Sequence, residues 1–282
     1  MSEMVVFGLG YSASVLAARL RGEGWRVRGT GGGGDLAFGD CATVAEALAG
    51  ASHVLSSVPP GRDGSDPVLA LHGESIRGSR AQWIGYLSST GVYGDTGGAW
   101  VDESAPVGGG RRSARVAADA AWRGLDPRVR VFRLPGIYGP GRSAVERVAE
   151  GRAHRIDLPE QVFSRIHVDD IAGGIVASLA APAGVYNLAD DLPASHNAVI
   201  EEACRLLGMP PPPVQTLDEA GLSPAARGFY AENRRVSTGK ARRVLGWRPR
   251  YPTYVEGLRA LSATTSPPSA TTPPPIANAD QR

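Results

Sequence analysis

Features that mark several classes of protein are scarce or absent in this chain of 282 residues. Its two cysteines, Cys41 and Cys204, are far apart in sequence and form no C-x-x-C pair, so neither a disulfide framework nor a metal site is indicated. No apolar run approaches the roughly 18 residues that span a bilayer, and the residues before the first predicted strand form no signal peptide. We therefore expect a soluble, cytoplasmic protein of a reducing compartment, with no metal and no membrane partner.

An excess of charge of one sign is also lacking, because 30 basic residues stand against 28 acidic ones. The arginines are scattered among acids and glycines and form no basic stripe, which argues against a nucleic-acid partner. The expected partner is a small-molecule substrate. With 42% hydrophobic residues, the chain can bury the core of one large domain or of a domain with a small lobe.

Large apolar side chains are nearly absent from residues 262–282, which are mainly Ser, Thr, Pro and Ala. Such a segment cannot offset the entropy lost on ordering by burying surface. We predict one folded domain over residues 1–261, followed by a disordered tail.

The most specific pattern lies in residues 4–30, MVVFGLGYSASVLAARLRGEGWRVRGT. Residues 4–7 form an apolar strand, residues 12–23 are typical of a helix, and residues 25–30 form a second strand. Together they are the length of a βαβ unit.

The glycine motif of this unit, G-x-G-x-x-A, comprises Gly8, Gly10 and Ala13. Gly8 permits the tight turn, Gly10 allows a pyrophosphate to approach the backbone, and Ala13 allows close packing of helix on strand. Tyr11 and Ser12 open the helix, whose N-terminus favours an anion. The motif predicts a dinucleotide site; the alternative is a glycine-rich turn in an ordinary α/β protein.

Strand-like and helix-like segments alternate through the first half, which predicts a parallel sheet with helices on both faces. Six strands are expected, at residues 4–7, 25–30, 36–38, 53–56, 83–87 and 129–133. The less regular second half carries strands near 162–166 and 184–187 and helices near 144–150, 169–180 and 195–207. We therefore predict an α/β fold, a Rossmann-type doubly wound parallel sheet over about 1–143 with a small C-terminal substrate lobe over about 144–261.

Five later segments, in order, resemble motifs of the extended short-chain dehydrogenase/reductases, in the NAD-dependent epimerase/dehydratase branch and its nucleoside-diphosphate-sugar epimerase-like subgroup. They are LSSTGVYGD (87–95), RLPGIYGPGR (133–142), RIHVDDIAGGI (165–175), VYNLADDLPAS (185–195) and KARRVLGWRPRYPTYVEGL (240–258). The resemblance implies an NAD(P)-binding oxidoreductase or epimerase that acts on a small polar metabolite such as a nucleotide sugar. The resemblance is also compatible with a homodimer.

The chain departs from this family at its catalytic pair, Tyr-x-x-x-Lys. Arg111 stands at the tyrosine position and Arg115 at the lysine position, and no tyrosine occurs between Tyr93 and Tyr138. An arginine stays protonated at physiological pH, so Arg111 cannot replace the tyrosine as an acid or base. Arg115 could still supply positive charge near a ribose. The loss keeps open an alternative function, a noncatalytic dinucleotide-binding sensor or regulatory protein.

Three hydroxyl groups remain as candidates for the chemistry. The resemblance gives Ser89 the role of the family's active-site Ser/Thr, which bonds the reacting oxygen; alternatively it satisfies backbone groups at a strand end. Tyr93 or Tyr138 could donate a proton if neighbouring charges lowered its pKa from about 10, although each could equally be a packing residue. His167, beside two acids, is expected to be structural.

The choice between NADP and NAD depends on the end of the second strand. NAD enzymes carry an acid there, whereas residues 30–34 read Thr-Gly-Gly-Gly-Gly, which favours NADP. No arginine follows to bind a 2′-phosphate, unless Arg28 reaches across. Further cofactor contacts are predicted at Asp40, Thr30, Ser57, Val58, Pro59 and Pro135. For Asp40 the alternative role is a helix cap.

Overall fold

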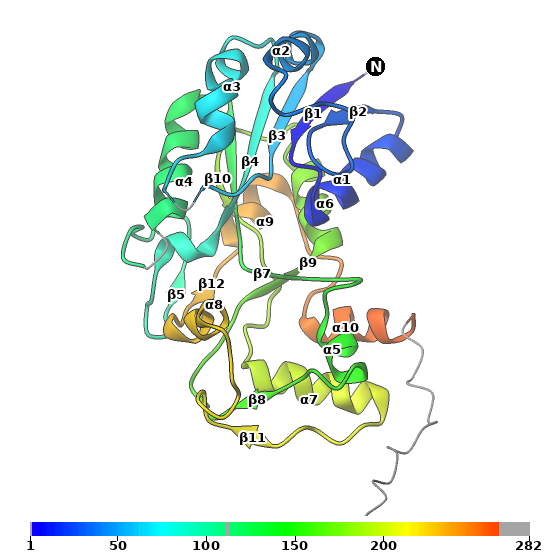
Figure 1. Ribbon diagram of the computed structural model, residues 1–282, viewed down its shortest axis with the longest axis vertical. Coiled ribbons are helices and arrows are strands. Elements are labelled where there is room, and N and C mark those ends of the chain that lie inside the picture. The colour runs from blue at the N-terminus through cyan, green and yellow to red at the C-terminus, as the bar shows by residue number, and fades with distance from the viewer. Residues whose placement is uncertain (1, 62, 111–112, 265–282) are drawn as a thin grey trace, which may run out of the picture.

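Six parallel strands form the central sheet of the computed structural model, which describes residues 2–61, 63–110 and 113–264. Their order across the sheet is β10-β6-β4-β3-β1-β2 (Figure 1). The bounds are β1 Glu3–Phe7, β2 Arg26–Gly29, β3 His53–Ser56, β4 Trp83–Ser89, β6 Val129–Leu134 and β10 Gly184–Asn187. This arrangement confirms the predicted Rossmann-type sheet.

Two strand predictions were wrong in detail. Residues 36–38 form no strand, because only Leu36 makes an isolated bridge to Thr30 before the chain turns to the next helix. The sixth strand is instead β10, which was predicted to lie in the lobe but pairs with β6. Burial explains its position, since Tyr186 of β10 stacks on Phe132 of β6 with ring centroids 6.2 Å apart.

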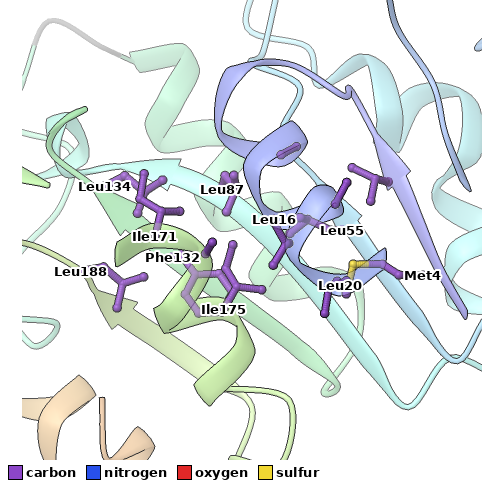
Figure 2. Packing of buried hydrophobic residues seen from close by; sticks show 14 of the residues in the cluster. Met4, Leu16, Leu20, Leu55, Leu87, Phe132, Leu134, Ile171, Ile175 and Leu188 are labelled. Carbon is purple, nitrogen blue, oxygen red and sulfur yellow. The ribbon is translucent and has the colours of Figure 1, made fainter. Parts of the chain in front are cut away.

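Helices cover both faces of the sheet, as the alternating pattern predicted. On one face lie α1 (Tyr11–Gly22) and α6 (Val168–Ala177), and on the other lie α2 (Cys41–Gly50), α3 (Pro67–Arg77) and α4 (Ser113–Leu125). Figure 2 shows how leucines of α1 and isoleucines of α6 meet over the strands. The labelled residues are Met4, Leu16, Leu20, Leu55, Leu87, Phe132, Leu134, Ile171, Ile175 and Leu188.

A smaller lobe with its own apolar core lies below the sheet in Figure 1. Its core is built by α5 (Ala144–Ala149), α7 (His196–Leu207) and α10 (Tyr254–Ser262). The short strands β8 (Arg155–Ile156) and β11 (Val214–Gln215) pair beside α7, and α8 (Pro224–Arg227) leads into the 3₁₀ helix η2 (Gly228–Ala231).

Short strand pairs connect the lobe and the sheet. β7 (Gly136–Tyr138) pairs with β9 (Arg165–His167), and β5 (Trp100–Val101) pairs with β12 (Arg235–Val236). The 3₁₀ helix η1 (Thr90–Tyr93) follows β4 directly, and α9 (Gly239–Leu245) packs on β10 and α6. Since α6 and β10 lie with the sheet, the chain crosses between the two parts more than once after residue 143.

Within the described ranges, no helix has the length and apolar character needed to cross a bilayer. The same residues hold no group of three potential metal ligands, and Cys41 and Cys204 are both free thiols. The predicted disordered tail falls, from residue 265 onward, outside the described residues.

Candidate functional site

The order of strands reverses between β1 and β3, and in open α/β sheets ligands bind at the carboxyl ends of the strands on either side of such a point. Gly8 directly follows β1 there with φ +82°, and its amide donates to the Thr30 hydroxyl at 3.0 Å. The Ser57 hydroxyl, after β3, donates to the Gly8 carbonyl. A Cβ on Gly8 would lie 2.9 Å from the Val58 side chain, so both space and backbone require glycine.

The N-terminus of α1 is open. Gly10 is the N-cap and supplies no side chain to the first amides, and a Cβ built on it meets no atom within 4 Å. Tyr11 and Ser12 line a cavity at this end, while Ala13 is buried between helix and sheet. Uncapped amides and the helix dipole make this position suited to an anionic group.

One cavity of about 720 Å³ extends from this helix end into the lobe. Ser57 and Pro59 lie at its sheet side, Ser89 and Arg115 at its middle, and Pro135 on the loop after β6. The lobe contributes residues of five separate elements or loops to the far wall. That far wall, here called the cationic end, comprises Arg147, His154, Arg165 and His196, with Tyr230 beside them.

Ser89 is on the cavity wall and also caps η1. Its hydroxyl oxygen accepts from the Gly91 amide at 3.1 Å, which leaves its proton available to a ligand. The neighbouring Ser88 hydroxyl is occupied by Asp119 at 2.7 Å. Both roles predicted for Ser89 are therefore compatible with its position.

Tyr93 does not line the cavity, which corrects the expectation that it could be a proton donor. Its hydroxyl donates to Asn187 at 2.8 Å and accepts from Arg133 at 3.0 Å. Arg133 in turn forms a buried bidentate pair with Asp119, at 2.8 and 3.0 Å. Burial raises the pKa of Tyr93. This polar network joins η1, α4, β6 and β10 and has a structural role.

Tyr138 lines the cavity, but its hydroxyl is turned toward α10. A Cβ built on Gly257 would overlap it, and the hydroxyl has no hydrogen-bond partner among the described atoms. Burial, with Asp190 and Asp170, raises the pKa of Tyr138 far above its ordinary value. Its ring packs edge-on against His167, 5.1 Å away. The packing role fits this position better than proton donation.

Of the two arginines at the family's catalytic positions, Arg111 lies outside the described residues. Arg115 lines the middle of the cavity, and its positive charge acts on the hydroxyl of Tyr86, whose pKa burial raises. A positive charge therefore lines the same cavity as Ser89, and the equivalence of Arg115 with the family's lysine stays a prediction.

The other predicted contacts divide between the cavity and the frame around it. Thr30 is buried and supports the glycine turn. Asp40 caps α2, accepting from the Thr43 amide at 3.1 Å and the Thr43 hydroxyl at 2.7 Å, and it does not line the cavity. His167 caps α6 through its Nδ1, which accepts from the Asp169 amide at 3.2 Å. This supports the structural role expected for His167.

A carboxylate does reach the end of β2, and it belongs to Asp35, six residues further along the chain than Gly29. Asp35 turns back so that one oxygen accepts from the Gly29 amide at 2.9 Å and the other pairs with Arg28 at 2.9 Å. Burial is the largest single effect and raises the pKa of Asp35, but the hydrogen bonds and the charge of Arg28 together hold that pKa below its ordinary value. Arg28, which was predicted as a possible partner of a 2′-phosphate, is therefore paired with an acid that was not expected at the end of β2.

The cationic end was not found by sequence reasoning. Its residues come from α5, β9, α7, η2 and the loop after α5, and no spacing or motif unites them. Three other arginines are engaged within the protein. Arg133 is in the buried network, Arg234 lines the cavity but pairs with Glu232, and Arg235 binds the Gly98 carbonyl.

Comparison with known proteins places this geometry in a class. A UDP-glucose 4-epimerase from Thermotoga maritima, solved with UDP-glucose, superposes with TM-score 0.76 over 93% of this chain and 97% of its own, at 16% identity. The human epimerase family protein SDR39U1, solved with NADPH, gives TM-score 0.75 over 93% and 100% at 17% identity. The chain thus shares the fold of these two epimerase-type proteins, and this is the fold that the resemblance of the motifs implied.

A closer relationship identifies the family. A functionally unknown conserved protein from Silicibacter pomeroyi DSS is 41% identical, with TM-score 0.83 over 94% of this chain and 99% of that one, and this chain belongs to its family. Protein YeeZ of Escherichia coli is 27% identical over 78% of this chain and 89% of its own. A 3-diazoavenalumate denitrifying reductase of Streptomyces is 34% identical over 51% of this chain, spanning only 49% of that protein. No protein-family profile matches the chain.

Proposed function

We propose that this protein is an NAD(P)-dependent oxidoreductase of the epimerase/dehydratase type that acts on a small polar metabolite, such as a nucleotide sugar. The observation that carries the proposal is the continuous cavity that joins the open N-terminus of α1 to Ser89 and then to the lobe. A dinucleotide at the sheet and a substrate in the lobe would meet at Ser89.

The residues around β1 and α1 fit the pyrophosphate of a dinucleotide. Gly8 and Gly10 leave the backbone bare, and the first amides of α1 face the cavity end. Ser57, Pro59 and Pro135 would flank the nicotinamide half. When bound, the nicotinamide supplies or accepts a hydride.

The chain's own contribution is electrostatic. The Ser89 hydroxyl would donate to the substrate oxygen, and Arg115 would stabilise the negative charge that develops on that oxygen as the neighbouring carbon gains a hydride. Arg115 cannot give up its proton at neutral pH, and neither Tyr93 nor Tyr138 is placed to do so. The oxygen would then take its proton from water.

For the cofactor we propose NADP over NAD, with Arg28 as the group that binds the 2′-phosphate. Asp35 occupies Arg28 in the absence of a ligand, and its carboxylate would have to yield to the phosphate. Gly31 has φ +98°, so placing an acid there to reverse the preference would also strain the backbone. Arg28 and Asp35 are the better positions for a test.

The test is hydride transfer, followed as nicotinamide absorbance across a panel of nucleotide sugars and small carbonyl compounds. Turnover that falls in Ser89→Ala and persists in Tyr93→Phe supports the proposal. The second candidate is a noncatalytic dinucleotide-binding sensor or regulator, favoured by the placement of both tyrosines in structural roles. Tight binding without turnover on any panel member would favour this candidate.

A further inference from the structure

Four basic side chains converge at the cationic end, far from the helix N-terminus that suits a dinucleotide. The rings of His154 and His196 stack with centroids 5.0 Å apart, and the Tyr230 hydroxyl lies 3.4 Å from His154 Nε2. Arg147 and Arg165 both act electrostatically on His196, whose pKa is lowered to about 3 mainly by burial. Tyr230 also lies in the field of both arginines.

Neither arginine of this cluster is neutralised by an acid. Arg165 donates to the backbone carbonyls of Phe163, Ala194 and Ser195 at 2.8, 2.9 and 3.3 Å. Within the residues that the structure describes, neither Arg147 nor Arg165 has a carboxylate within the 4 Å of an ion pair, and the Arg147 guanidinium makes no hydrogen bond.

The acids near these two arginines are otherwise engaged or neutral. Glu232, which also lines the cavity, pairs with Arg234 at 2.9 Å. Glu146, beside Arg147, accepts from the amides of Ser143 and Gly141 in the cap of α5. Burial raises the pKa of Asp190 to about 8, so that this group is largely protonated near pH 7 and does not offset Arg165. Burial lowers the pKa of Arg165 only to about 10, and the guanidinium stays charged. The cavity thus ends in uncompensated positive charge.

Aromatic rings form the wall next to this charge. The ring of Phe163 meets that of Tyr230 edge-on at 5.6 Å, and the guanidinium of Arg165 lies 5.8 Å from the centroid of Phe163. The imidazole Nε2 of His196 is buried with no partner among the described atoms. A ligand here would meet an apolar surface and, beyond it, donors for an anion.

We propose that the cationic end binds the acidic group of a compact organic acid, whose apolar body lies against Phe163 and Tyr230 and whose reacting atom points toward Ser89. The anion would accept from Arg147 and from the free donors of Arg165. This substrate class rests on the proposed function for the hydride step, but the binding of the acid itself does not need the dinucleotide.

The test is calorimetric titration of the full-length protein with cinnamate and with its neutral amide, cinnamamide, each with and without NADPH. We expect cinnamate to bind at least about tenfold more tightly than cinnamamide, because the amide offers no charge to the arginines. Inorganic phosphate should compete with cinnamate for the same donors. Failure of phosphate to compete, or equal affinity for acid and amide, would overturn the proposal.

Arg147→Met should lower cinnamate affinity by about tenfold or more, whereas Arg147→Lys should retain most of it. Arg152→Met is the matched control, since Arg152 is exposed, pairs with Glu150 and does not line the cavity. Equal losses in Arg147→Met and Arg152→Met would contradict the assignment. If NADPH fails to bind while cinnamate binding still depends on Arg147, the proposed function fails and the acid site stands.

Discussion

The two ends of the cavity are built in different ways. At the sheet end, the elements that would hold a ligand lie within the first sixty residues and depend on glycine backbone, on one helix terminus and on a turn held by Thr30 and Ser57. At the cationic end, arginine and histidine side chains from four segments converge beside an aromatic wall. The first construction uses backbone groups, and the second uses side chains, which we propose select the substrate.

The strongest expected effect comes from breaking the buried network beside the cavity. Asp119→Ala leaves the Arg133 guanidinium buried without its carboxylate, which should destabilise the fold by about 3–5 kcal/mol. Urea denaturation measures this change. Glu74→Ala is the control, because its pair with Arg77 is exposed and should contribute less than about 1 kcal/mol. Similar losses in both variants would contradict the structural role of the network.

The rate of the reaction in the middle of the cavity should depend on the Ser89 hydroxyl and the Arg115 charge, and not on the Tyr138 hydroxyl. We expect Ser89→Ala and Arg115→Met each to lower kcat by about 10²-fold, because each removes one group that stabilises the developing oxyanion. Tyr138→Phe should change kcat by less than about twofold, as its hydroxyl faces α10. Steady-state rates on an active panel compound give the comparison. A large loss in Tyr138→Phe alone would restore that tyrosine as the proton donor.

A smaller effect is expected from pH at the cationic end. The folded-state pKa of His196 is about 3, against about 6.5 when unfolded. Below pH 6.5 the unfolded chain therefore binds a proton that the folded protein does not, and stability falls as pH decreases toward 3. By pH 5 this costs up to about 2 kcal/mol, and His196→Gln should remove the loss. Measuring the free energy of unfolding of the wild type and His196→Gln at pH 7 and pH 5 checks this prediction. An equal pH dependence in the two proteins would contradict a buried, neutral His196.

The smallest effect concerns the choice of cofactor at the end of β2. Arg28→Ala should weaken NADPH binding severalfold and leave NADH binding nearly unchanged, because only NADPH carries the phosphate. Asp35→Ala should act in the opposite direction by freeing Arg28. Competitive titration of the two cofactors measures both shifts. An Arg28→Ala variant with the same ratio as the wild type would remove Arg28 from the cofactor site.

The same contrast explains what the sequence could predict. The G-x-G-x-x-A unit is local, so spacing alone placed Gly8, Gly10 and α1 correctly. Strand β10 was misplaced because a four-residue strand carries little pattern of its own and is defined by its pairing with β6. The carboxylate of Asp35 was not predicted at the end of β2, because it reaches Gly29 only through a turn of the chain. The cationic end had no local signal, because Arg147 of α5 and Arg165 of β9 come together only in the folded protein.

The measurement that bears most directly on the central claim is calorimetric titration of NADPH and NADH into the wild type, Gly10→Val and Gly22→Val. Gly10 faces open space at the start of α1, where a branched side chain would exclude a pyrophosphate, and Gly22 is equally open at the far end of the same helix. The account predicts that the wild type and Gly22→Val bind alike and that Gly10→Val loses about 100-fold or more in affinity while remaining folded. A folded Gly10→Val variant that binds either dinucleotide as tightly as the wild type, or a wild type that binds neither, would contradict it.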